Sequence, residues 1–227
     1  MNDALSTRAR ILEAAAGLFA DRGFRKVTIR DICRAADVNV AAVNYHFGDK
    51  VGLYQEVLQL AIDAMRGTTE EARRLGAGLP AEERLRRFVA VFVERILTSG
   101  SQIIHRLIHR EINDPTPAFH RLMEDGVRPR VEYLAGLAAE IIGCPPSDER
   151  ALRSAFSVQA QVIACFPNPV SARLGFKPPP AVADGIARHI SDFSLRGIEG
   201  LRGTGARAAR RGPLRRKAAR REGRGPA

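Results

Sequence analysis

The chain has 227 residues, of which 45% are hydrophobic, so it can form an ordinary domain and a smaller one and is not disordered throughout. Its net charge is +11, but ten Lys and Arg residues lie beyond position 200 with Glu222 as the one acid there, and they account for most of that charge. The total charge is therefore weak evidence for a nucleic-acid partner.

The cysteines and the apolar runs exclude other classes of protein. Cys33, Cys144 and Cys165 lie far apart without a CxxC spacing, which argues against a disulfide framework and a structural zinc site. The longest uninterrupted apolar run, Phe88–Val93, is too short for a membrane span, and charged residues interrupt the region where a signal peptide would lie. We expect a cytoplasmic protein with no metal, no cofactor and no membrane partner.

The predicted fold class is all-α. Nearly every segment shows the 3.6-residue period of a helix, and no stretch alternates apolar and polar residues between turn signals. The first helix is expected over Ser6–Arg22, and Gly23 supplies the left-handed residue that ends it.

Two short helices are predicted next, over residues 28–36 and 40–47. Thr28 and Asp31 form a capping-box-like start for the first of them, and Asn39 is a good N-cap for the second. The two residues between these helices allow only a sharp turn. This pattern is typical of a helix-turn-helix.

The second short helix has the division of side chains that a recognition helix needs. Val43 and Phe47 can point inward, which leaves the other side to Ala41, Ala42, Asn44, Tyr45 and His46. Short side chains let the backbone enter the major groove, and Asn44 offers a donor and an acceptor to a base or a phosphate. The alternative is that these helices merely pack together as a bundle, which would not require such polar groups on one exposed side.

A composite motif of many spaced positions runs from Thr28 to Leu53. Its members are Thr28, Asp31-Ile32, Ala35-Ala36, Val38, the run Val43-Asn-Tyr-His-Phe-Gly-Asp-Lys50, and Leu53. In these positions the chain resembles the DNA-binding domain of the TetR family of regulators, over about residues 8–57. The resemblance implies that Arg30, Val40, Ala41, Ala42 and Asn44 face bases and that Tyr45, His46 and Lys50 hold phosphates. The chain departs from the family at Asp37, where glycine is usual, but aspartate enters the left-handed region more readily than most residues.

The second half of the chain is also predicted to be helical. Helices are expected from about Lys50, and over about residues 81–97, 101–113, 117–142, 147–166 and 181–201, with Ser147 as a cap. The segments 105–119 and 155–161 resemble the CecR-like, or CerR-like, members of the TetR family. That resemblance implies a helical domain with an inducer cavity, whose last two long helices pair across a two-fold axis.

These observations predict three regions. Residues 1–49 would form the helix-turn-helix DNA-binding domain, and residues 50–201 a helical ligand-binding and dimerisation domain. Residues 202–227 would be a disordered Arg-rich tail, because they cannot bury enough apolar surface to offset the entropy of ordering. The tail could grip DNA non-specifically or be a dispensable, solubilising extension.

Several side chains are candidates for lining the inducer cavity, although phenylalanine and methionine in such positions more often belong to an ordinary core. They are Phe88, Phe92, His105, His109, Phe119, Met123 and Phe156. His105 and His109 are four residues apart with Glu111 nearby, a spacing that could ligate a metal, but the sequence fixes no third ligand. A role in inducer binding is favoured over metal binding, and the alternative to both is a solvated or cavity-lining pair.

The predicted function is that of a sequence-specific transcriptional regulator. It would be a homodimer that represses transcription at a palindromic operator in double-stranded DNA and is released by an unknown small-molecule inducer. The alternative is an architectural nucleic-acid-binding protein that acts through its basic tail. No enzyme is expected, because the sequence shows neither a credible nucleophile–base pair nor a metal cluster.

Overall fold

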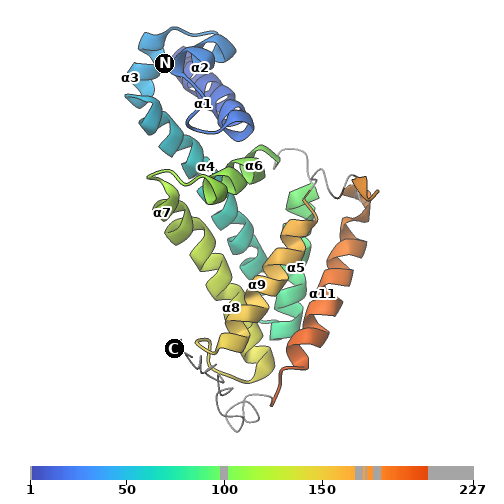
Figure 1. Cartoon of the computed structure of the whole chain (residues 1–227). Helices are drawn as coiled ribbons and strands as arrows, with labels where there is room; N and C mark the ends of the chain where they lie inside the picture. Colours follow the sequence, from blue (N-terminus) through green and yellow to red (C-terminus); the bar gives the residue numbers. More distant parts are fainter. Residues whose placement is uncertain (1, 98–101, 167–170, 172, 176–179, 204–227) are drawn as a thin grey trace, which may run out of the picture.

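The computed structural model describes residues 2–97, 102–166, 171, 173–175 and 180–203, and all the regular structure in these ranges is helical (Figure 1). The all-α prediction is confirmed. The tail beyond residue 203 lies outside the described residues.

Three helices form the amino-terminal unit: α1 (Asn2–Arg22), α2 (Ile29–Ala36) and α3 (Val40–Phe47). They pack around a small apolar core to which Phe19, Ile32 and Val43 each contribute a fully buried side chain. Gly23 ends α1 with a φ of 80°, as its position predicted. In Figure 1 this unit lies at one end of the molecule.

Helix α4 (Lys50–Leu75) joins the amino-terminal unit to the larger helical bundle. Its first half places Leu53 and Val57 in the amino-terminal core, whereas Ala72 near its end belongs to the core of the bundle. One continuous helix therefore spans both cores. A movement of this helix would therefore displace side chains in both cores.

The bundle consists mainly of α5 (Ala81–Leu97), α8 (Arg128–Ile142), α9 (Glu149–Ala164) and α11 (Ala183–Glu199). Their apolar faces meet in one core, and α11 packs along α5 at the outer side of the bundle (Figure 1). A short 3₁₀ turn, Pro180–Val182, precedes α11. None of the described helices is long and apolar enough to cross a membrane.

The single helix expected over residues 117–142 is interrupted, and the prediction was wrong on this point. The structure shows α7 (Phe119–Arg121), then a π-helical segment η2 (Leu122–Val127), before α8 begins. Pro129 has no N–H with which to continue the regular ladder to the carbonyl of Asp125. Instead, Arg66 of α4 donates to that carbonyl at 2.9 Å.

The start of α9 also differs from the expectation. Asp148, not Ser147, is its N-cap, and the Asp148 carboxylate accepts the backbone N–H of Arg150 at 2.8 Å. The same carboxylate forms an ion pair with the Arg150 side chain, which a serine hydroxyl could not do. Hydrogen bonds from Arg150 hold the pKa of Asp148 down at about 2.

Candidate DNA interface and effector cavity

The start of α2 is held by a reciprocal pair of hydrogen bonds. The backbone N–H of Asp31 donates to the Thr28 hydroxyl at 3.2 Å, and the backbone N–H of Thr28 donates to the Asp31 carboxylate at 3.0 Å. The bonds from Thr28 lower the pKa of Asp31, so the carboxylate stays ionised near the positive end of the helix. The predicted capping box is confirmed.

The turn between α2 and α3 depends on two residues. Asp37 has φ 52° and ψ 57°, so it occupies the left-handed conformation that the motif requires there. Arg10 of α1 donates to the carbonyl oxygens of Ala36 and Asp37 at 2.9 and 2.7 Å. It thus satisfies carbonyls that the end of α2 leaves free. Nothing in the sequence singled out Arg10, because its partners are 26 and 27 residues away.

Helix α3 is anchored on one side and open on the other. The Asn39 side chain caps it by accepting the N–H of Ala42 at 2.8 Å, as predicted. Val43 and Phe47 are buried, and the guanidinium of Arg8 lies over the Phe47 ring at 5.2 Å. The orientation of α3 is therefore fixed by its inner face.

The outer face of α3 contains the side chains proposed to meet DNA. Val40, Ala41, Asn44 and Tyr45 are exposed, Tyr45 to 83%, and Ala42 and His46 are half-buried. Arg30 is exposed on α2. Tyr45 is therefore accessible to a partner outside the chain.

Lys50, the remaining predicted phosphate contact, has a defined environment at the start of α4. Its ammonium lies 4.4 Å from the centroid of the Phe24 ring. That ring packs in turn on Tyr54, and partial burial lowers the pKa of Lys50. The cation is thus positioned by an aromatic ring beside the amino-terminal end of α4.

Helix α6 (Gln102–Asn113) connects the amino-terminal unit with the bundle. Arg110 donates to the carbonyl oxygens of Ala20 and Asp21 at the end of α1, the first at 2.6 Å. Glu111 is completely buried and accepts the Tyr54 hydroxyl of α4 at 2.5 Å. Thus α6 is bonded to both helices that position the helix-turn-helix.

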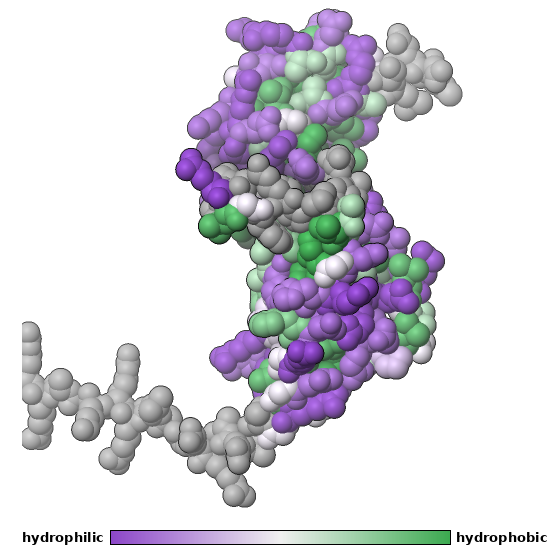
Figure 2. Space-filling model, turned by 90° about the vertical axis from the view of Figure 1, so that its right-hand side faces the viewer, coloured by the Kyte–Doolittle hydropathy of each residue, from purple (hydrophilic) through white to green (hydrophobic). Residues whose placement is uncertain are grey.

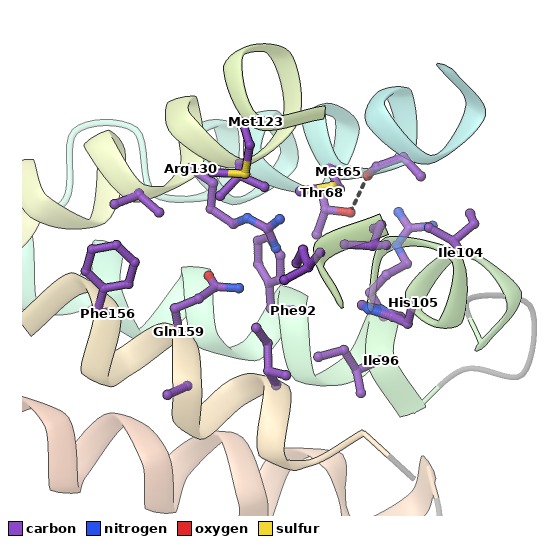
Figure 3. Close-up of a pocket in the computed structure, with 18 of the residues that line it drawn as sticks. Met65, Thr68, Phe92, Ile96, Ile104, His105, Met123, Arg130, Phe156 and Gln159 are labelled. Atoms are coloured by element: carbon purple, nitrogen blue, oxygen red, sulfur yellow. Dashed lines mark hydrogen bonds between the residues drawn. The ribbon is translucent and has the colours of Figure 1, made fainter. Parts of the chain in front are cut away.

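A cavity of about 550 Å³ lies between α4, α5, α6, η2, α8 and α9 (Figure 3). Five of the seven predicted residues line it: Phe92, His105, Phe119, Met123 and Phe156. Most other lining groups are aliphatic, and the volume is within the range of small-molecule sites, about 300–1,000 Å³.

Phe88 and His109, also predicted to line the cavity, lie outside it. Phe88 is fully buried one layer behind, stacked on Phe92 with ring centroids 4.4 Å apart. His109 is exposed, and its ring lies beside the amide of Asn113 at 3.2 Å. Within the described ranges no group of three His, Cys, Asp or Glu side chains is arranged to hold a metal.

Four polar residues of the cavity were not predicted: Thr68, Arg95, Arg130 and Gln159. Burial lowers the pKa of Arg130 to about 10, and burial with the nearby Arg130 charge lowers the pKa of His105 to about 4. At neutral pH the arginine is therefore charged and the imidazole neutral. The sequence did contain a signal, since Arg130 is on the same helical stripe as the buried Leu134 and Leu137.

A capped helix-turn-helix joined by shared helices to a bundle with a ligand-sized cavity defines a DNA-binding transcriptional regulator. Residues 11–57 match the family described as bacterial regulatory proteins, tetR family. Residues 81–198 match the family described as HTH-type transcriptional dual regulator CecR, C-terminal domain. The chain therefore belongs to the TetR family and has a CecR-type carboxy-terminal domain.

Individual relatives agree with this assignment. The chain is 28% identical to the HTH-type transcriptional dual regulator CecR of Shigella flexneri over 69% of this chain and 74% of that protein. It is 29% identical to the Probable HTH-type transcriptional regulator YttP of Bacillus subtilis over 57% of this chain and 69% of that one. A TetR-family regulator from Streptomyces coelicolor superimposes with a TM-score of 0.64 at 21% identity, covering 86% and 96% of the two chains, which shows the shared fold.

The chain is thus a sequence-specific, DNA-binding transcriptional regulator, and its family consists of regulatory proteins, not enzymes. Members of the family bind operator DNA as dimers and respond to small molecules. The comparisons give no support to the alternative of an architectural protein acting through its tail.

Proposed function

We propose that this chain is a homodimeric repressor whose two α3 helices bind a palindromic operator and which a small molecule in the cavity releases. Residues 1–49 would provide the DNA-binding domain, and residues 50–201 the effector-binding and dimerisation domain. The observation that carries the proposal is the exposed outer face of α3, on a helix whose ends and inner face are all secured.

In this arrangement the contacts are divided by side-chain chemistry. Arg30, Val40, Ala41, Ala42 and Asn44 would approach base edges, because small or hydrogen-bonding groups suit close entry into the major groove. Tyr45, His46 and Lys50 would hold phosphates. Contacts with phosphates do not distinguish one base from another, so these groups would fix the position of the helix on the DNA.

The cavity and the DNA-binding unit share α6. Ile104, His105 and Ile108 of this helix line the cavity, and Arg110 two residues later bonds to the end of α1. A ligand that displaces α6 would therefore move α1 and the helix-turn-helix packed on it. The ligand can lower the operator affinity by no more than the factor by which it binds the displaced arrangement of α6 more tightly than the DNA-binding one.

Exposed apolar side chains on the last two long helices support a homodimer. Leu152 of α9 is 43% exposed, and Phe193 of α11 is 64% exposed. Figure 2, which faces the α11 side of the molecule, shows hydrophobic patches among hydrophilic residues. Pairing of these helices between two copies would remove the patches from water and set the distance between the two α3 helices.

The test of the proposal is a gel shift of the purified protein on the DNA upstream of its own gene. Asn44→Ala and Tyr45→Ala should each weaken binding about tenfold or more, because a lost specific contact costs about 1–3 kcal/mol. Glu70→Ala, an exposed change on α4 far from α3 in the sequence, is the matched control and should bind as wild type does. Unchanged binding by both α3 variants would refute the site.

The same assay separates the proposal from an action of the basic tail. A chain truncated after Leu201 should keep its preference for the upstream DNA over unrelated DNA, because the α3 face is intact. Its affinity should depend less steeply on salt if the tail contacts phosphates. Loss of all specific binding on truncation would instead favour the tail.

A further inference from the structure

We propose that the cavity binds an organic anion, an apolar molecule with one carboxylate-like group that pairs with Arg130. This inference rests on the proposed ligand-binding role of the cavity and specifies the chemical class of the ligand. It follows from one buried charge and from what surrounds it.

Arg130 is a buried cation without a counter-charge. Its side chain is 7% exposed, and its Nε is buried with no hydrogen-bond partner. Neither a hydrogen bond nor an ion pair joins its guanidinium to any residue that the structure describes; its defined contact is the Phe92 ring, 4.9 Å from the guanidinium carbon. Burial of an unpaired guanidinium is unfavourable, so the arrangement is incomplete without an anion.

Comparison with two other arginines shows that the lack of a counter-charge is a feature of the buried arginine in the cavity. Arg128, two residues earlier on α8, is far more exposed than Arg130, yet it forms an ion pair with Glu124 at 2.7 Å. Arg150 likewise pairs with Asp148 at 2.8 Å. The buried arginine, which most needs a partner, is the one that points into the cavity instead (Figure 3).

The charged groups among the described lining residues are cationic; Arg130 is buried, whereas Arg95 is about half exposed and pairs with Glu71. Two arginines, Arg95 and Arg130, and the histidine His105 lie among the described lining residues, which include no aspartate or glutamate. A cationic ligand would therefore be repelled. A neutral ligand could accept hydrogen bonds but would leave the charge of Arg130 uncompensated.

Two further polar groups are placed to complete an anion site. Gln159 extends from α9 toward the same space as Arg130, and its buried Oε1 has no hydrogen-bond partner (Figure 3). An amide in this position can present its NH₂ to a carboxylate by turning over. His105 is neutral at pH 7 and can donate one ring N–H.

The rest of the ligand must be apolar, because the remaining walls offer almost nothing polar. Met65, Ile96, Ile104, Phe119 and Met123 supply aliphatic, thioether and aromatic surface. The Thr68 hydroxyl is already used as a donor to the Ala64 carbonyl at 2.7 Å. An aromatic or branched aliphatic acid fits this division into one charged end and one apolar body.

Isothermal calorimetry on the full-length protein, without DNA, tests the inference with three probes of similar size that share one apolar body: 2-naphthoate, 2-naphthamide and 2-naphthylmethylammonium. Wild type should bind the anion about tenfold or more tightly than the amide, since a buried charge-assisted pair exceeds a neutral hydrogen bond. The ammonium compound should bind most weakly. Inorganic phosphate, which lacks an apolar body, should not compete at the same concentration.

Variants assign the preference to one residue. Arg130→Gln should abolish the difference between anion and amide, and Arg130→Lys should retain part of it. Arg95→Gln removes a more exposed cationic group of the same cavity and is the matched control, which should keep most of the preference. Circular dichroism of each variant checks that the helices are intact.

Three results would overturn the inference: equal affinity of wild type for anion and amide, an undiminished preference in Arg130→Gln, or no binding of any probe at millimolar concentration. None of them depends on operator binding, which the gel shift measures separately. A protein that binds its upstream DNA but ignores the charge of the probe would refute this inference alone. A protein that prefers the anion but does not bind DNA would refute the proposed function instead.

Discussion

Glu111 is completely buried, and its partners lie on α4 and in the loop that follows α6. Its two oxygens accept the Tyr54 hydroxyl at 2.5 Å and the backbone N–H and hydroxyl of Thr116 at 2.9 and 2.8 Å. Removal of one donor leaves part of a buried charge unsatisfied. We therefore expect Tyr54→Phe to lower the free energy of unfolding by about 1–3 kcal/mol, measured by urea denaturation.

Tyr45→Phe is the matched control for this prediction. It removes the same hydroxyl from a side chain that is 83% exposed, so the free energy of unfolding should change by less than about 0.5 kcal/mol. Its effect should appear in DNA affinity instead. Equal destabilisation by the two changes would show that the buried pair contributes nothing specific.

His105 gives the stability a defined dependence on pH. Burial, assisted by the Arg130 charge, lowers its pKa to about 4, whereas the imidazole of an unfolded chain titrates near about 6.5. Between these values the unfolded chain binds a proton that the folded chain does not. The free energy of unfolding must therefore fall as the pH drops through this window.

The measurement compares wild type with His105→Gln by urea denaturation at several pH values from about 7 to about 4. Wild type should lose on the order of 1–3 kcal/mol more than the variant over this range, because carboxylates titrate in both proteins and cancel. Parallel stability profiles would mean that His105 titrates normally in the folded chain.

The turn between α2 and α3 contains a non-glycine residue with a positive φ. Asp37 has a positive φ of 52°, a conformation that costs a β-branched residue about 1–2 kcal/mol and glycine nothing. Asp37→Val should therefore lower the free energy of unfolding by at least about 1 kcal/mol, and Asp37→Gly should be neutral or slightly stabilising. Thermal unfolding of both variants is sufficient, and equal melting temperatures would contradict the assignment.

Elements defined by local chemistry were predictable from the sequence. Thr28, Asp31 and Asn39 form their caps with neighbours three residues away, so the bounds of α2 and α3 could be read nearly to the residue. The π-helical segment was missed although Pro129 was a local signal for it, and the compensating bond from Arg66, 59 positions from its partner Asp125, could not be read from the sequence. For the same reason Arg10, which secures the turn, gave no signal.

The residues that line the cavity were also only partly predictable from the sequence. Helical periodicity identifies residues that face inward but not whether they meet another helix or an open space. Phe88 and Phe92 are thus equivalent in the sequence, yet Phe92 lines the cavity and Phe88 supports it from behind. His105 and His109 differ likewise, because α6 faces the bundle at one residue and solvent at the other.

At the scale of the whole molecule, the distance between two recognition helices depends on how two copies pair. Phe193 stacks on His189 along the outer side of α11 and remains 64% exposed in the single chain. A charge at this position would have to be buried, unpaired, in a paired α11 surface. We therefore expect Phe193→Asp to shift the protein from dimer to monomer in sedimentation velocity.

The monomer should retain the helical content of wild type but bind the upstream DNA at least about a hundredfold more weakly, because each half-site must then be occupied independently. Leu60→Asp is the matched control: it places the same charge at an apolar residue of α4 that is 47% exposed and lies between Leu58 and Ala61 of the amino-terminal core, and it should remain a dimer. If Phe193→Asp is still dimeric while its operator affinity is unchanged, the two copies pair through a different surface. The exposed stripe of α11 would then require another partner to explain it.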